Sequence, residues 1–516
     1  MAIKVILLVV FFSVMIGTGL YCRKNSTDVN GFVLGGRSVG PWLTAFAYGT
    51  SYFSAVIFVG YAGQFGWKYG IAATWAGIGN ALLGSLLAWS VLGRRTRIMT
   101  QHLDSATMPD FFGKRFDSRA LKIAASVITF IFLVPYTASL YNGLSRLFGM
   151  AFKVDYSVCV VVMAILTGIY VIAGGYMATA INDFIQGCVM LVGIVAVIVA
   201  VMKSQGGFMA AYQSMAKITD PSVTEVPGMF ASFFGPDPLN LLGVVLLTSL
   251  GTWGLPQMVQ KFYAIKSERS ISTGTIVSTG FAIIVAGGCY FLGGFGRLFM
   301  APEQVKEMGF DAIVPTMLSG LPDLLIAIVV ILVLSASMST LSSLVLTSSS
   351  TLTLDLIKDN IVKDMDEKKQ VFVMRVLLVI FIAISVVIAI IQYKTNVTFI
   401  AQLMGVSWGA LAGAFLAPFL FGLYWKGTSA IGCWASFIFS TVVMIANIFM
   451  RSSFPAILQS PINAGAFCMI AGLIIVPVVS LFTPKPDRKM VEEAFESYNK
   501  KVVVAQSEAL ADGEEA

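Results

Sequence analysis

The stretch LSASMSTLSS, residues 334–343, is the most informative part of this chain. It places six hydroxyl side chains within ten residues, between the apolar flanks IAIVVILV (326–333) and LVL (344–346). A hydrocarbon interior offers no water, so hydroxyls and free carbonyls there must satisfy one another or coordinate an ion. Oxygen ligands at helical spacing suit a small hard cation such as Na⁺. Close packing between membrane helices, which also favours Ser and Thr, is the alternative interpretation.

The composition on both sides of this stretch indicates an integral membrane protein. Of the 516 residues, 57% are hydrophobic and 12% are charged, and the mean hydropathy is +0.84. Soluble globular chains are not this apolar. We predict an all-α protein with about 13 transmembrane helices, because apolar runs of about 20 residues, the length that crosses the hydrocarbon, recur throughout. The predicted spans are 2–22, 41–66, 71–93, 120–149, 157–175, 178–203, 240–262, 272–299, 313–354, 371–392, 397–424, 428–449 and 463–483, the ninth being long enough for an additional short helix.

The positions of Lys and Arg predict the orientation of these spans. If the N-terminus is outside, most of the 34 basic residues fall in the cytoplasmic segments 23–40, 94–122, 261–271, 355–375, 425–427 and 484–516. Cytoplasmic loops are enriched in basic residues, so we expect a multi-pass plasma-membrane protein with its C-terminus inside. The net charge of +7 then needs no nucleic-acid partner. A transmembrane domain, 1–483, would precede a cytoplasmic tail, 484–516, with an amphipathic helix at 488–504 and a disordered end.

Two spans are predicted to be broken near their middles. The second contains AFAYGTSYFSAVIFVGYAG (45–63), and the seventh contains LLTSLGTWGLPQMVQ (246–260). Gly lowers the cost of unwinding, and Pro removes a backbone donor. The breaks lie five spans apart, which predicts two inverted five-span repeats at about 41–203 and 240–424 with a midplane binding site between them. A kinked but continuous helix is the alternative at each position.

Other functional classes find little support in the residues. The chain has one histidine, His102, and no G-x-x-x-x-G-K-[ST] loop, so we expect neither an enzyme nor an ATP-driven pump. The six cysteines show no C-x-x-C pairing and are expected to be free thiols rather than metal ligands. A solute-gated channel would need a polar pore with a filter motif. A transporter-like sensor would need an added signalling domain, for which the tail is short.

Several separated motifs resemble those of the sodium/solute symporter family. They are LGGRSVGP (34–41), GRRTR (93–97), MPDFFGKRF (108–116), YVIAGGYMATAINDFIQ (170–186) and SASMSTLSS (335–343). The resemblance extends over most of the chain and is greatest to the proline-carrying branch of the family. It implies a fold of the leucine-transporter type, in which a sodium-coupled symporter imports a small organic solute by alternating access. Proline or another amino acid is the first expected solute, and a monocarboxylate, a sugar or a vitamin is the alternative.

The resemblance also implies two positions for the coupling ion, Na⁺. The common site would use the backbone carbonyls of Thr50, Phe53 and Ala336 and the hydroxyls of Ser339 and Thr340. The last three are spaced i, i+3, i+4, which places them on one face of one helix. A second site, found in some members, would use Asp183, Ser342 and Ser343. No cofactor other than this ion and no obligate protein partner is expected, and membrane lipid surrounds the chain.

The expected solute pocket differs from that of the proline carriers. Where they have an acidic residue in the first broken helix, this chain has Tyr52, and Thr248 and Thr252 replace aromatic residues of the second. The predicted pocket residues are Tyr52, Ser54, Tyr136, Thr248, Thr252, Trp253 and Pro256.

Overall fold

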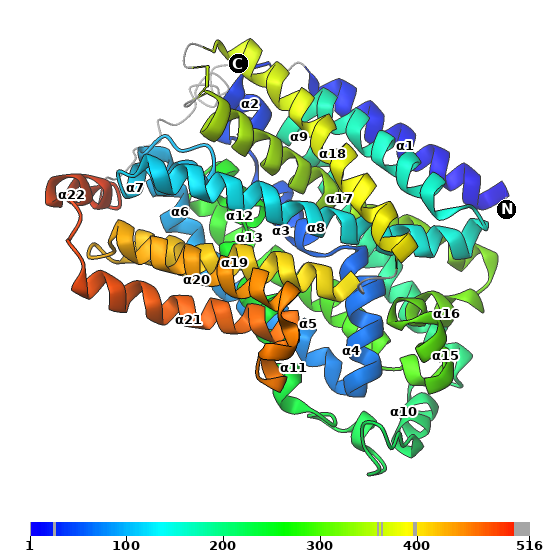
Figure 1. The fold of residues 1–516 in the computed structure, drawn as a ribbon. Coiled ribbons are helices and arrows are strands. Elements are labelled where there is room, and N and C mark those ends of the chain that lie inside the picture. The colour runs from blue at the N-terminus through cyan, green and yellow to red at the C-terminus, as the bar shows by residue number, and fades with distance from the viewer. Residues whose placement is uncertain (1, 24–26, 359–360, 363–364, 396–399, 500–516) are drawn as a thin grey trace, which may run out of the picture.

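The computed structural model describes residues 2–499 apart from 24–26, 359–360, 363–364 and 396–399 (Figure 1). Helices run side by side through the molecule, and the described residues form no strand. This arrangement confirms the predicted all-α fold. A bilayer favours it because each helix satisfies its own backbone hydrogen bonds without water.

Ten segments are long and apolar enough to cross a membrane, or eleven if a bent pair of helices counts as one span, within the described residues. Six of the ten are single helices: α1 (Ala2–Cys22), α8 (Arg119–Phe152), α18 (Glu367–Thr395), α19 (Ile400–Tyr424), α20 (Ala430–Phe449) and α21 (Pro461–Phe482). A seventh is α17 (Asp323–Thr351), which continues into the π-helical turn Leu352–Lys358. An eighth is formed by α13 (Arg269–Ala282) and α14 (Gly288–Gly293) with the π-helical turn Ile283–Gly287 between them. A short helix, α16 (Ile313–Ser319), precedes α17, as the length of the ninth predicted span suggested.

The two remaining segments are each about twice the length of one crossing. One covers 47 residues, Val56–His102, and includes α4 (Ala62–Tyr69), α5 (Thr74–Ala81) and α6 (Arg94–His102). The other is α9 (Tyr156–Ser204), with 49 residues. Each contains a glycine with positive φ, Gly70 at 64° and Gly175 at 54°, a conformation that interrupts a right-handed helix. The count of 13 depends on treating each segment as two spans and stays a prediction.

Both predicted breaks are present and have nearly the same geometry. The first separates α3 (Pro41–Tyr52) from the π-helical turn Val56–Tyr61, and the second separates α11 (Pro238–Gly254) from α12 (Pro256–Ala264), which is bent by 46°. The residues at the breaks are extended, Phe53 with φ −88° and ψ 121° and Leu255 with φ −80° and ψ 121°. Each donates its N–H to a glycine carbonyl four residues earlier, that of Gly49 or of Gly251.

α17 lies in the centre of the molecule, where it contacts α3, α8, α9 and α12. From Leu332 to Thr351 every residue of this helix is buried. The hydroxyl-rich stretch therefore faces protein on all sides and both broken helices lie against it.

The two ends of the helix bundle carry different short helices (Figure 1). α10 (Phe208–Lys217) and α15 (Pro302–Met308) lie at one end, and α7 (Met108–Arg115) and the tail helix α22 (Arg488–Glu496) lie at the other. α2 (Val29–Leu34) precedes the first broken helix. The amphipathic tail helix is thus present over 488–496, whereas positions 500–504 of the prediction and the expected disordered end lie outside the described residues.

α22 is docked against the ends of α6 and α19. The Tyr498 hydroxyl donates to the Leu423 carbonyl at 3.0 Å. The Arg95 guanidinium lies between two rings, 4.0 Å from the centre of Tyr424 and 4.6 Å from that of Tyr498. Cation–π contacts of this kind, added to the burial of Val491, Ala494 and Phe495, attach the tail to the bundle.

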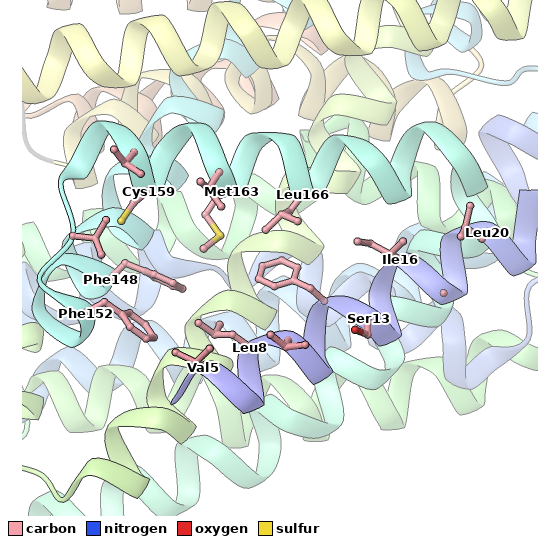
Figure 2. A pocket seen from close by; sticks show the side chains of 16 residues that line it. Val5, Leu8, Ser13, Ile16, Leu20, Phe148, Phe152, Cys159, Met163 and Leu166 are labelled. Carbon is pink, nitrogen blue, oxygen red and sulfur yellow. The ribbon is translucent and has the colours of Figure 1, made fainter. Parts of the chain in front are cut away.

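A large apolar pocket lies between α1, α8 and α9 (Figure 2). It has a volume of about 800 Å³ and is lined by aliphatic and phenylalanine side chains with Cys159 and Met163, and Ser13 is the one hydroxyl in the lining. α1 also exposes Val5, Ile6, Val9 and Val10, as a helix does on its lipid side. The pocket has no convergent polar groups, so the candidate site lies elsewhere.

Candidate functional site

The first candidate site lies where the break in the first broken helix meets α17. The C-terminus of α3 leaves carbonyl groups without helical partners, as every helix end does. On α17 the residues Ala336, Ser339 and Thr340 lie on one face and point the same way. Both chain segments are fully or almost fully buried here, so the polar atoms must find partners within the protein.

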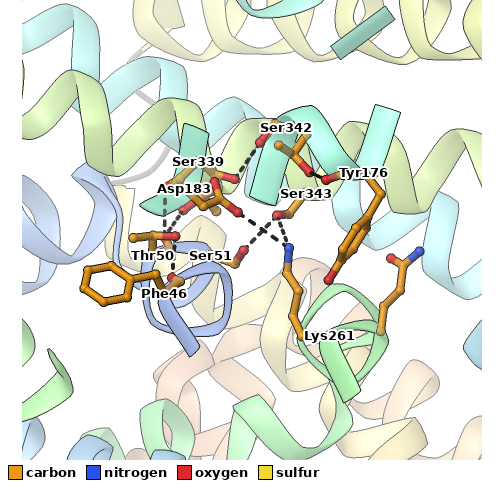
Figure 3. A network of polar contacts seen from close by, with 12 residues as sticks. Phe46, Thr50, Ser51, Tyr176, Asp183, Lys261, Ser339, Ser342 and Ser343 are labelled. Atoms are coloured by element: carbon orange, nitrogen blue, oxygen red, sulfur yellow. Dashed lines mark hydrogen bonds and ion pairs between the residues drawn. The ribbon is translucent and has the colours of Figure 1, made fainter. Parts of the chain in front are cut away.

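Five oxygen atoms converge at this junction. The Ser339 hydroxyl lies 3.0 Å from the carbonyl oxygen of Thr50 and 3.1 Å from that of Ala336. The Thr340 hydroxyl lies 3.2 Å from the carbonyl oxygen of Thr50 and 3.4 Å from that of Phe53. Its distance to the carbonyl oxygen of Ala336 is 3.1 Å. All five residues predicted for the common ion site are therefore brought together, and Figure 3 shows two of the contacting residues, Thr50 and Ser339.

The chemistry of this cluster is that of a cation site. Three backbone carbonyls and two hydroxyls are neutral hard oxygens, with no basic side chain among them. Hydroxyls that now donate to the carbonyls can rotate and present their lone pairs to an ion instead. Two helices supply the ligands, so an ion bound here would link α3 to α17.

The second predicted ion position is arranged differently. Asp183 on α9 and Ser343 on α17 lie close together, but a lysine from α12 lies between them (Figure 3). The Nζ atom of Lys261 is 3.0 Å from Ser343 Oγ and 3.8 Å from Asp183 Oδ2. The third predicted ligand, Ser342, donates to the Ser339 carbonyl at 2.8 Å. The three residues are neighbours, and whether they bind a sodium ion stays a prediction.

Sequence reasoning missed this lysine. It was counted as the first residue of the basic segment 261–271, whereas the structure places it in α12 with 2% of its surface exposed. Asp183, near the start of the predicted span 178–203, is fully buried. The signal that could have found the pair is the rule that two opposite charges at membrane depth must be partners.

The predicted pocket residues separate into two groups. Tyr52 and Thr252 line a small cavity beside the first break, and Thr248 and Tyr136 lie close enough to Tyr52 to affect its electrostatics. The fifth member of this group is Ser54, which accepts from the Val56 N–H at 3.3 Å. Trp253 and Pro256 form the second group. The Trp253 indole N–H donates to the Leu83 carbonyl at 2.9 Å. Pro256 begins α12 on the far side of the second break.

Aromatic residues from distant spans lie around Tyr52, one of the residues that line this cavity. The rings of Tyr52 and Tyr136 lie 5.7 Å and 5.9 Å from that of Trp408 on α19. Tyr61 and Tyr290 are also near Tyr52. The hydroxyls of these four tyrosines and the Trp408 indole N–H lack a well-formed hydrogen bond within the described residues. Buried donors without partners are costly, so a ligand that accepts hydrogen bonds would be stabilised here.

The cavity is closed in this conformation. Its volume is about 10 Å³, which is the size that a single water molecule occupies. On the α12 side, Arg37 donates to the Ser105 carbonyl at 2.7 Å, and Arg97 donates to the Ile265 carbonyl at 2.6 Å. A solute larger than water can enter a cavity of this size only after the surrounding side chains or helices move.

A buried oxygen cluster and a small polar–aromatic cavity at two broken helices define the class of protein. They are the features of a secondary transporter, whose ion and solute sites lie at discontinuous helices near the midplane. Residues 32–439 match the model of the sodium:solute symporter family. The chain belongs to this family, as its motifs indicated.

Two relatives named as proline transporters match almost the whole chain. The osmoregulated proline transporter OpuE of Bacillus subtilis (strain 168) is 28% identical over 498 residues, which are 94% of this chain and 96% of that protein. A sodium/proline symporter of Staphylococcus aureus (strain JH9) is 29% identical over 494 residues, 94% of this chain and 93% of the relative.

A solved structure supports the fold. The substrate-bound, outward-open state of a Na⁺-coupled sialic acid symporter superposes with a TM-score of 0.73 at 16% identity, over 94% of this chain and 98% of that one. At this identity the likeness concerns the fold alone, and it confirms the leucine-transporter type of architecture.

Proposed function

We propose that this protein is a sodium-coupled symporter that imports a small organic solute, with proline or another amino acid as the first candidate. The observation that carries the proposal is the cluster of five buried oxygens between the first break and α17. Family membership and the two proline-transporting relatives support the same function. Monocarboxylates, sugars and vitamins are the alternative solutes, and the chain would act in the plasma membrane.

Sodium would act by linking two parts of the molecule that otherwise separate. With Na⁺ bound, Thr50 and Phe53 of the first broken helix and Ser339 and Thr340 of α17 share one ligand. The ion then favours the conformation in which these oxygens converge and the pocket beside them is formed. The membrane potential contributes about 2.3 kcal/mol per 100 mV to the inward movement of each Na⁺. This free energy drives the solute inward together with the ion.

The pocket favours a small solute with an apolar face and hydrogen-bond acceptors. Trp408 and the tyrosine rings offer flat apolar surfaces, and the unpaired hydroxyls and indole N–H offer donors. The helical turn that follows the first break begins at the break, and the positive end of its dipole would favour a carboxylate bound there. Both features suit an amino acid such as proline.

We also propose the division of the chain into repeats at about 41–203 and 240–424. Its support is the pair of matching breaks, together with the sequences that form them. Gly49-Thr50 precedes the break at Phe53 by four residues, and Gly251-Thr252 precedes the break at Leu255 by the same spacing. Residues 1–483 would form the transporter domain, with 484–516 as its cytoplasmic tail.

Uptake by the purified full-length chain in proteoliposomes tests the proposed function. We expect labelled proline, or another amino acid from a panel that also contains monocarboxylates, sugars and vitamins, to accumulate when Na⁺ is higher outside. Replacing the external Na⁺ by choline should abolish accumulation. Equilibration of a solute without accumulation in a Na⁺ gradient would indicate the channel alternative, and binding without flux would indicate the sensor alternative.

The orientation is tested by labelling single cysteines in intact cells. With the exposed Cys188 removed, Glu303→Cys on α15 should react with a membrane-impermeant maleimide from outside. Ala120→Cys, at the start of α8, should react only after the cells are permeabilised, because we place 94–122 in the cytoplasm. The opposite labelling pattern would reverse the proposed topology.

A further inference from the structure

A buried lysine lies at the position predicted for a second sodium ion. Lys261 extends from α12 towards α17 and α9, and its ammonium group lies among the side chains of Ser343, Asp183 and Tyr176 (Figure 3). The distances from Nζ are 3.0 Å to Ser343 Oγ, 3.8 Å to Asp183 Oδ2 and 5.1 Å to the centre of the Tyr176 ring. The proposed function does not yet assign a role to this group.

The surroundings of the ammonium explain why it is stable at membrane depth. An isolated buried charge is very costly, whereas an ion pair that is also hydrogen-bonded can be accommodated. Asp183 supplies the opposite charge, Ser343 accepts a hydrogen bond, and the face of the Tyr176 ring contributes a cation–π contact. The site is therefore built for one positive charge.

The same arrangement leaves no ligand set for a further cation. Ser343 Oγ is shared between Lys261 and Ser51 Oγ, which lies 2.7 Å away. Ser342 donates to the carbonyl of Ser339. An ion bound to Asp183 and Ser343 would lie beside the ammonium, where two like charges repel strongly in a medium of low dielectric constant.

We propose that the Lys261 ammonium is a tethered cation that takes the place of the second sodium ion, so that the carrier binds and transports one Na⁺ per solute. The inference rests on the proposed function and specifies its coupling ratio. It also gives the two broken helices parallel connections to α17. Sodium links the first of them at Ser339 and Thr340, and Lys261 links the second at Ser343 without leaving the protein during the cycle.

The number of sodium ions bound at equilibrium tests the proposal without a transport assay. Purified full-length wild-type protein should bind one ²²Na⁺ per chain with a hyperbolic isotherm. Lys261→Ala removes the ammonium and leaves Asp183 and Ser343 free to coordinate an ion. We expect this variant to bind two ions per chain, and to carry two charges per solute when reconstituted.

Two control variants separate the site from general effects. Adding Asp183→Asn to Lys261→Ala removes the carboxylate and should restore binding of a single ion. Lys266→Ala changes an exposed lysine five residues further along the chain and should behave as wild type.

The possible outcomes distinguish this inference from the function on which it rests. Two ions bound by wild type, or one ion bound by folded Lys261→Ala, would overturn the tethered-cation proposal while leaving sodium coupling intact. If Lys261→Ala does not fold, the wild-type stoichiometry alone decides. Wild-type protein that binds no sodium while it still transports a solute would contradict the proposed sodium coupling instead.

Discussion

Ser339→Ala and Thr340→Ala are each expected to weaken sodium binding roughly 10- to 150-fold. Each variant removes one of five oxygens from a buried cluster in which the hydroxyls lie 3.0–3.4 Å from the carbonyls of Thr50 and Phe53. Losing one partner of a hydrogen bond to a charged group costs about 1.5–3 kcal/mol. Each 1.4 kcal/mol corresponds to about a tenfold change in affinity. Equilibrium ²²Na⁺ binding to the purified variants measures the effect.

The linkage between ion and solute provides a second readout of these variants. Because coupling is reciprocal, their apparent solute affinity should fall at fixed Na⁺ and recover when Na⁺ is raised. Ser335→Ala is the matched control, since it removes a buried hydroxyl of α17 that makes no contact with this cluster. If Ser335→Ala disturbed sodium binding and the other two variants did not, the hydroxyl-rich face would be a packing surface and the proposed ion site would be wrong.

Gly66→Ala is expected to destabilise the whole bundle. A Cβ atom built on Gly66 of α4 would lie 1.9 Å from the carbonyl oxygen of Gly293 on α14, much closer than non-bonded atoms can approach. Two helices pack backbone against backbone here, so one of them must move to admit a methyl group. Overpacking of this kind costs about 1–3 kcal/mol and more where the obstacle is backbone. We expect a lower unfolding temperature and loss of uptake.

Gly280→Ala is the control for this variant. Gly280 is also a helical glycine, on α13, but a Cβ atom there would meet no atom within 4 Å. Replacing such a glycine by alanine should be neutral or stabilise the helix by roughly 0.5–1 kcal/mol. Thermal unfolding of both variants in the same detergent provides the comparison. Equal stability of Gly66→Ala and wild type would show that α4 and α14 are not in close contact.

The main features of the fold could be predicted because the bilayer restricts what a sequence can do. Apolar runs of sufficient length must be helices, so the spans followed from hydropathy. The breaks were predicted from Gly49, Gly251 and Pro256. Losing backbone hydrogen bonds at membrane depth is costly, so a break is expected only where glycine or proline makes unwinding easier. The choice of Ala336, Ser339 and Thr340 came from the family resemblance, and helical periodicity places them on one face. These signals are local in the sequence.

The features that escaped prediction depend on contacts between distant segments. Lys261 lies at the end of the predicted span 240–262, so counting basic residues assigned it to the loop that follows. Only its contact with Asp183 reveals its position in α12. The rings around Tyr52 come from α8, α14 and α19, which no pattern within one span connects. The matching Gly-Thr pairs are too short to stand out until both breaks have been located.

The docked tail helix has a consequence for the conformational changes of the transport cycle. α22 and the residues after it contact α6 through Arg95 and α19 through the Leu423 carbonyl, so they bridge two helices that are far apart in the sequence. Any conformational change that moves α6 away from α19 at this end must break the contacts of the tail with at least one of these two helices. The strength of the bridge therefore adds to the barrier for opening this face. A bulky fusion at the C-terminus that displaced α22 would remove these contacts and lower that barrier.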